Sequence, residues 1–132
     1  MERVFVDTSG WYALVDRRDP AHKAIKAWFE QNTLPLITTD YVFDETLTLI
    51  RAELGHRVAV DFGEKLRSSV WAQLVLVTVE DREAAWGIFK KFKDQRFSFT
   101  DCTSFAVMRR LGLSQVLTVD RHFRLMGFVL VV

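Results

Sequence analysis

The chain has 132 residues, 49% hydrophobic and 27% charged, a composition typical of a folded domain and not of a disordered chain. This length suits one domain covering residues 1–132 and is too short for two. Lys and Arg number 18 and Asp and Glu 17. The net charge of +1 excludes a polybasic surface, so any contact with a nucleic acid must depend on a local basic patch.

Short β-branched or aromatic segments alternate along the chain with helical patterns. The predicted strands are residues 4–6, 36–38, 74–77, 116–119 and 128–132. The predicted helices are residues 21–31, 41–54, 57–69, 80–93 and 101–111. Most of the strands are nearly continuous apolar runs, which is typical of strands covered on both faces. We therefore expect an α/β domain with a central, mainly parallel sheet of about five strands flanked by helices.

Four acidic residues stand at or near the predicted strand ends. Asp7 directly follows the first strand and Asp120 the fourth. Glu45 lies in the first turns of the helix after the second strand, and Asp101 opens the helix that leads to the fourth. Because ligands of open α/β sheets bind outside the carboxyl ends of the strands, we expect these acids to converge there. Taken singly, the three aspartates could instead be helix caps, since Asp is a favoured N-cap residue.

Helical phase separates Glu45 from its neighbour Asp44. An apolar stripe runs along this helix through Phe43, Leu47, Ile50 and Leu54. Asp44 falls nearly opposite the stripe and should be solvated, whereas Glu45 falls at its edge. Asp101 also points inward on its own helix. Both acids are therefore predicted to be partly buried.

Several partly buried carboxylates do not stay ionised together without a counter-charge. No Lys or His stands beside Asp7, Glu45 or Asp101 in the sequence. A divalent cation would supply the charge, and an all-oxygen ligand set suits Mg²⁺ or Mn²⁺. Zinc is disfavoured because the candidate nitrogen and sulfur ligands are scattered: His22, His56, His122 and Cys102.

Four motifs, in this order and spacing, resemble the PIN-domain ribonucleases, and most closely the VapC toxins of prokaryotic toxin–antitoxin pairs. They are Val-Asp-Thr-Ser-Gly within residues 4–10, Asp-Glu-Thr at 44–46, Ser-Phe-Thr-Asp-Cys at 98–102 and Thr-Val-Asp-Arg-His-Phe at 118–123. Each motif is weak alone, but the ordered set is fairly specific and covers essentially the whole chain. The resemblance implies a PIN-like domain with a five-stranded parallel sheet and Mg²⁺- or Mn²⁺-dependent endonucleolytic hydrolysis of RNA. It also implies a small antitoxin as partner and a homodimer, with a dimer surface or antitoxin groove on the helix pair 41–54 and 57–69.

Transferred residue by residue, the resemblance assigns Asp7, Glu45 and Asp101 as the core metal-binding and catalytic acids and Asp120 as the fourth. It assigns Ser9 or Thr8 as the hydroxyl residue that supports the first acid. One departure is His122, where many members of the family have a further acid.

Two other enzyme classes that place acids at strand ends fit the sequence poorly. A phosphatase of the haloacid-dehalogenase type needs a second Asp two residues after the first, where this chain has Ser9. A receiver domain needs an acidic pair after its first strand, which Glu2 and Asp7 do not form. A PIN fold that binds RNA or protein without cleaving it remains an alternative. Trp11 and Tyr12, just after Asp7, are candidates for contact with a partner or a base.

The sequence also bears on location. Residues 1–7 have no apolar segment of signal-peptide length, and the longest apolar stretch, residues 70–79, is about half of what spans a bilayer. A single cysteine gives no internal disulfide that would need an oxidising compartment. We expect a cytoplasmic protein without a membrane partner.

Overall fold

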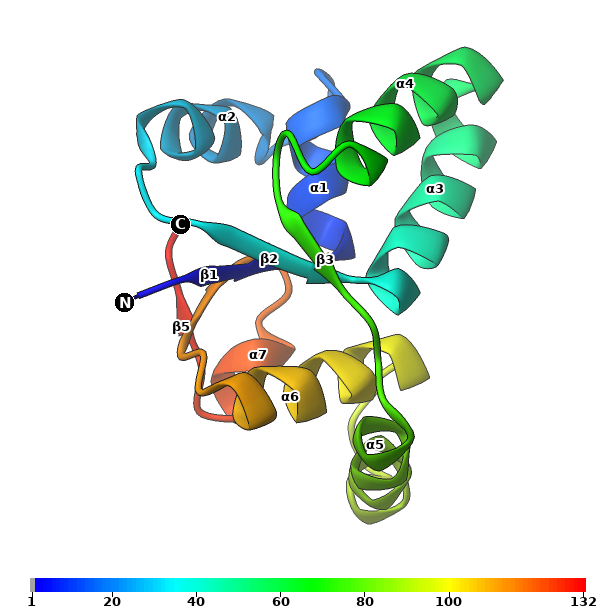
Figure 1. Cartoon of the computed structure of the whole chain (residues 1–132), viewed down its shortest axis with the longest axis vertical. Coiled ribbons are helices and arrows are strands. Elements are labelled where there is room, and N and C mark those ends of the chain that lie inside the picture. The colour runs from blue at the N-terminus through cyan, green and yellow to red at the C-terminus, as the bar shows by residue number, and fades with distance from the viewer. Residues whose placement is uncertain (1) are drawn as a thin grey trace.

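The computed structural model describes residues 2–132, which form a five-stranded, all-parallel sheet with helices on both faces (Figure 1). The strand order is β3-β2-β1-β4-β5. The elements are β1 (Val4–Val6), α1 (Thr8–Val15), α2 (His22–Gln31), β2 (Leu36–Thr39), α3 (Asp40–Leu54), α4 (His56–Arg67), β3 (Gln73–Val75), α5 (Val79–Lys91), α6 (Phe99–Leu111), β4 (Gln115–Leu117), α7 (His122–Leu125) and β5 (Val129–Leu130). The predicted α/β fold with about five parallel strands is confirmed.

The central strand β1 is buried along its whole length, which explains why its sequence is apolar at every position. Val4 pairs with Leu36 of β2 on one side and with Gln115 of β4 on the other. In Figure 1, α1 to α4 lie above the sheet and α5 to α7 below it. The fold therefore buries the end of β1, and the residue that follows it, between two helical layers.

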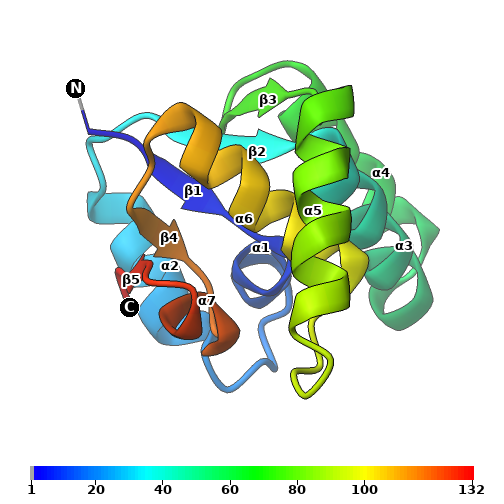
Figure 2. The same cartoon turned by 90° about the horizontal axis from the view of Figure 1, so that it is seen from below.

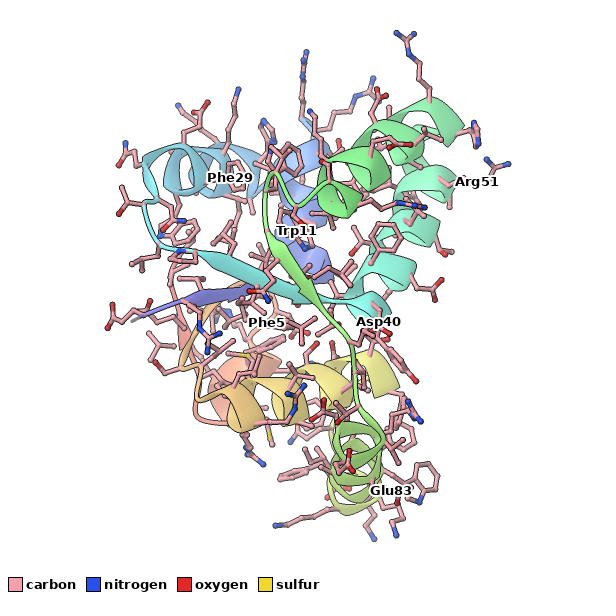
Figure 3. All side chains as sticks on the ribbon, viewed as in Figure 1. Phe5, Trp11, Phe29, Asp40, Arg51 and Glu83 are labelled. Carbon is pink, nitrogen blue, oxygen red and sulfur yellow. The ribbon has the colours of Figure 1, made fainter. Side chains whose placement is uncertain are left out.

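Trp11 on α1 is buried in the core and therefore inaccessible to a partner or a base, so the prediction for this residue is wrong. Its side chain is fully buried, and its indole ring stacks on that of Trp71 with 6.0 Å between the centroids. Its Nε1 donates a hydrogen bond to Oγ1 of Thr38 at 3.1 Å. Figure 3 marks Trp11 on α1 beside the sheet. Tyr12, the neighbouring candidate, is only partly buried.

Gly10 lets the first turn of α1 approach the end of β4. A Cβ atom at this position would lie 2.3 Å from the carbonyl oxygen of Leu117, which no side chain tolerates. The backbone N–H of Asp7 donates to that same carbonyl at 3.4 Å. This close approach places Asp7 next to the loop that carries Asp120.

Some predicted boundaries differ from the observed ones. The strand predicted at 74–77 ends at Val75, because the N–H of Val77 donates to the carboxylate of Asp40, which Figure 3 marks at the start of α3. Thr78 then caps α5. The fourth strand ends at Leu117, so Asp120 stands three residues beyond it and does not directly follow it. Two observed helices, α1 and the short α7, were not among the predicted ones.

An ion pair between a buried acid on α5 and an exposed arginine on α6 joins the two helices. Asp81 is 3% exposed, and its two carboxylate oxygens accept hydrogen bonds from Nε and Nη2 of Arg110 at 2.9 and 2.8 Å. This pair fixes α6, and thus its first residues, relative to α5. Within residues 2–132, none of the helices combines the length and apolar character that crossing a bilayer requires.

Candidate active site

All four predicted acids line one pocket of about 300 Å³ at the carboxyl ends of the strands. They come from four separate segments: the end of β1, α3, the first turn of α6 and the loop between β4 and α7. In Figure 1, the arrowhead of β2 points toward the first turn of α3, at the edge where the pocket lies. The remaining lining residues are Thr8, Ser9, Tyr12, Asp19, Leu49, Ser98 and Val119.

Asp7 is the N-cap of α1 and the most buried of the four acids, with 5% of its surface exposed. Its Oδ1 accepts hydrogen bonds from the N–H of Gly10 at 3.0 Å and from Oγ of Ser9 at 2.9 Å. The pKa of Asp7 is raised from 3.8 to about 7, mainly by burial and in smaller part by the charge of Asp101, against the lowering effect of these hydrogen bonds. The capping role and a functional role are compatible, because the cap uses only one carboxylate oxygen.

Ser9 contacts Asp7, whereas Thr8 contacts a different acid. Oγ of Ser9 lies 2.9 Å from Oγ1 of Thr118 and accepts the N–H of Val119 at 3.0 Å, so it connects Asp7 to the end of β4. Oγ1 of Thr8 donates to Oε1 of Glu45 at 2.6 Å. Of the two hydroxyl residues predicted to support the first acid, Ser9 is therefore the one that is bonded to it.

Glu45 and Asp44 lie on the sides of α3 that the helical phase predicts. Asp44 is exposed, whereas Glu45 is partly buried and faces the pocket. The hydrogen bond from Thr8 holds Oε1 of Glu45 in place. Its other oxygen accepts no hydrogen bond from residues 2–132 and is available to a ligand.

Asp101 is the third residue of α6 and not its N-cap. Ser98 is the N-cap, and the two residues form a capping box in which each side chain accepts the other's backbone N–H. This arrangement uses Oδ2 of Asp101. The pKa of Asp101 is raised from 3.8 to about 6, mainly by burial and in smaller part by the charges of Asp120 and Glu45, against the lowering effect of the capping hydrogen bonds.

His122 contacts Asp120 and lies near Asp101, although the sequence singled it out only as a departure from the family pattern. Its Nδ1 lies 3.1 Å from Oδ1 of Asp120, and its backbone N–H donates to the same oxygen at 2.9 Å. Nδ1 is buried and makes no aligned hydrogen bond within residues 2–132. One ligand atom each from Asp101, Asp120 and His122 lies within 4.8 Å of the others, so the three could hold a metal ion.

The charges of this pocket fit a bound cation. Within residues 2–132, no Lys or Arg forms an ion pair with any of the four acids; the single Arg–carboxylate pair is that of Asp81 with Arg110. The pKa values of Asp7 and Asp101 are raised mainly by burial and in smaller part by the neighbouring acids, so a cation bound here would stabilise their ionised forms. Carboxylate oxygens free on one side, with one nearby imidazole nitrogen, are a donor set suited to a hard divalent cation.

Two further polar residues of the pocket were not predicted. Asp19 is in the loop between α1 and α2, where its Oδ1 accepts the N–H of Ala21 at 2.8 Å. The sequence Asp19-Pro20 indicates only a helix start, so nothing in it points to the pocket. Ser98, in contrast, could have been found, because Ser-x-x-Asp at residues 98–101 is a capping-box pattern.

Comparison with known proteins adds an independent line of evidence. The profile of the PIN domain family matches residues 4–129. The chain belongs to the PIN-domain family. Over 126 residues, it is 36% identical to the 23S rRNA-specific endonuclease VapC20 of Mycobacterium tuberculosis, covering 96% of this chain and 95% of the relative. The resemblance predicted from the motifs is therefore confirmed.

Two solved structures resemble this fold. The crystal structure of M. tuberculosis VapC20, described as a Sarcin-Ricin loop cleaving toxin, superposes with a TM-score of 0.90 at 35% identity over 96% of both chains. FitAcB from Neisseria gonorrhoeae superposes with a TM-score of 0.72 at 12% identity over 96% of this chain and 95% of the other. The second likeness shows only the shared fold.

Proposed function

We propose that this protein is a metal-dependent endoribonuclease and the toxin of a toxin–antitoxin pair. The observation that carries the proposal is the convergence of four acids, from four segments, on one pocket, with no Lys or Arg among residues 2–132 paired to them. Identity of 36% over almost the whole length of a 23S rRNA-specific endonuclease supports the same conclusion.

In this proposal, Asp7, Glu45, Asp101 and Asp120 hold Mg²⁺ or Mn²⁺, and His122 is a further candidate ligand. A bound cation of this kind lowers the pKa of a coordinated water and polarises a phosphoryl oxygen. The protein's own contribution is to fix the carboxylates. Ser9 orients Asp7, Thr8 orients Glu45, and the capping box orients Asp101.

The raised pKa of Asp7 has a consequence for the pH at which the site works. With a pKa of about 7, Asp7 is partly protonated at neutral pH before it binds a cation. Cation binding requires the ionised carboxylate, so it competes with this proton. Cleavage should therefore increase as the pH rises through 7, with Mg²⁺ held below saturation.

The sarcin–ricin loop of 23S rRNA is the first substrate to test, because the relative with 36% identity is described as cleaving it. We further propose a small antitoxin protein as partner, a homodimer, a cytoplasmic location and a nuclease domain that comprises residues 1–132. The family likeness is the basis for the antitoxin and the homodimer, the chain length for the single domain, and the single cysteine for the location.

A PIN fold that binds RNA without cleaving it is the alternative, and a cleavage assay separates the two. Purified ribosomes and a mixed RNA pool are incubated with the protein in Mg²⁺ or in EDTA. We expect cleavage that EDTA abolishes, that Asp101→Asn removes and that the matched control Asp44→Asn retains. RNA that remains intact in both Mg²⁺ and Mn²⁺ would contradict the nuclease and favour the binding module.

A further inference from the structure

The exposed face of α5 carries a pair of stacked aromatic side chains that the core does not use. Trp86 is 50% exposed and Phe89 42% exposed. Their rings are nearly parallel, at 18°, with 5.9 Å between the centroids. Exposed, pre-stacked rings on a rigid helix offer a flat apolar surface to a planar ligand.

These rings border a second pocket, of about 400 Å³, which has basic side chains beside it. Its lining consists of Trp86, Phe89, Lys90, Phe92, Lys93, Gln95 and Phe97. The Nζ of Lys90 lies 5.9 Å from the centroid of the Trp86 ring. Residues 86–97 include four Lys or Arg and one acid, in a chain whose net charge is only +1. Aromatic rings beside basic side chains are the composition of surfaces that bind single-stranded nucleic acids.

Aromatic contacts connect this surface to the acidic pocket along two routes. On the first, Phe89 meets the edge of Phe99 at 6.1 Å, and Phe99 is the first residue of α6, two before Asp101. On the second, Phe97 meets the His122 ring at 5.1 Å, and His122 contacts Asp120. Figure 2 shows α5 in front of α6, with the connecting loop returning to the start of α6.

We propose that Trp86 and Phe89, with Lys90 and Lys93, form a subsite that stacks an unpaired RNA base next to the phosphate cleaved at the acidic pocket. Charge favours RNA as the occupant, because the basic residues of the subsite lie beside a strongly acidic pocket that repels phosphates unless cations fill it. The stacked rings bind the base, and the two lysines neutralise flanking phosphates. The proposal rests on the proposed ribonuclease function, because the surface is a substrate subsite only if RNA is cleaved at the acidic pocket.

Binding can be tested without catalysis on a protein carrying Asp7→Asn, with Mg²⁺ present because the acidic pocket repels phosphates unless cations fill it. The probes are a fluorescein-labelled unpaired RNA oligonucleotide and a sarcin–ricin stem-loop, measured by fluorescence anisotropy. Adding Trp86→Ala should raise the dissociation constant between about 5-fold and about 100-fold, the usual range for loss of one stacked base. Trp86→Phe, which keeps a ring, should restore most of the affinity. The exposed control Val129→Ala on β5 should bind like the parent protein.

The charge component has its own readout. Removing Lys90 and Lys93 together by substitution with Gln should lower the slope of log affinity against log salt by about 0.7 for each phosphate that the lysines no longer neutralise. Light scattering on the same proteins checks for the rival occupant, a second copy of this chain. Unchanged affinity in Trp86→Ala, a parent protein that binds neither RNA, or a changed molar mass in Trp86→Ala would each overturn the subsite.

Cleavage by the otherwise wild-type protein separates this inference from the proposed function. Trp86→Ala should raise KM for RNA and leave kcat within about 3-fold, because the ring positions substrate and does not touch the metal ligands. Cleavage that is indifferent to Trp86→Ala would refute the subsite and leave the nuclease standing. RNA binding that depends on Trp86, in a protein that never cleaves, would refute the nuclease and support the subsite.

Discussion

Asp7→Asn tests the electrostatic account of the pocket through stability. Burial raises the pKa of Asp7 from 3.8 to about 7, so the folded protein holds a proton that the unfolded chain releases. Folding is therefore penalised by the ionisable carboxyl, and the penalty grows from about pH 4 to pH 7 and then stays constant. With the pKa raised from 3.8 to about 7, the penalty on the free energy of folding is about 4 kcal/mol at pH 8 and about 2 kcal/mol at pH 5.

Asn can still cap α1 and accept the N–H of Gly10, so Asp7→Asn removes the penalty and keeps the cap. Without metal, the variant should gain about 2–3 kcal/mol more, relative to wild type, at pH 8 than at pH 5. Its melting temperature at pH 8 should exceed that of wild type by on the order of 10 °C.

The assay is unfolding in urea, with EDTA present, at both pH values. Asp44→Asn serves as the control, because Asp44 is exposed, and it should change stability little at either pH. If the advantage of Asp7→Asn were no larger at pH 8 than at pH 5, burial would not raise the pKa of Asp7 and the reasoning would be wrong.

Two further predictions each compare the stability of two variants that carry the same substitution at different positions. Gly10→Ala should destabilise the fold by more than about 3 kcal/mol, because its Cβ would overlap the last carbonyl of β4. Gly87→Ala, whose Cβ would meet nothing within 4 Å in α5, should stabilise the fold by about 0.5–1 kcal/mol. Melting temperatures of the two variants and of wild type test both predictions. Arg110→Ala should cost about 2 kcal/mol because it leaves the buried carboxylate of Asp81 without its two charged hydrogen bonds, whereas Arg109→Ala, which removes an equally exposed arginine that forms no ion pair within residues 2–132, should cost under about 0.5 kcal/mol. Equal unfolding midpoints in urea for the two arginine variants would contradict the importance of the ion pair.

The sequence predicted the parts of the fold that depend on local chemistry. The first strand was predicted with its observed bounds, because a short β-branched and aromatic run favours a strand and the capping Asp that follows it ends that strand. Helical phase placed Glu45 and Asp44 on the correct sides of α3, because an isolated apolar stripe fixes which side of a helix is buried.

Long-range contacts account for what the sequence could not show. Trp11 follows Asp7 closely and looked accessible, but α1 is enclosed by the sheet and by an aromatic cluster whose other members are distant in the chain. The third strand ends early because Asp40 accepts the N–H of Val77, a contact between residues 37 positions apart. The place of His122 beside Asp101 also depends on how α6 and the loop after β4 meet.

Direct titration of Mn²⁺ into the protein by calorimetry tests the central claim, that the acidic pocket binds a divalent cation. Glu45 and Asp44 are adjacent on α3, and only Glu45 faces the pocket. We predict that Asp44→Asn binds Mn²⁺ as wild type does and that Glu45→Gln weakens binding at least about 10-fold, as expected for loss of a charged ligand. Equal Mn²⁺ affinity in Glu45→Gln and Asp44→Asn, or no binding by wild type, would contradict the account.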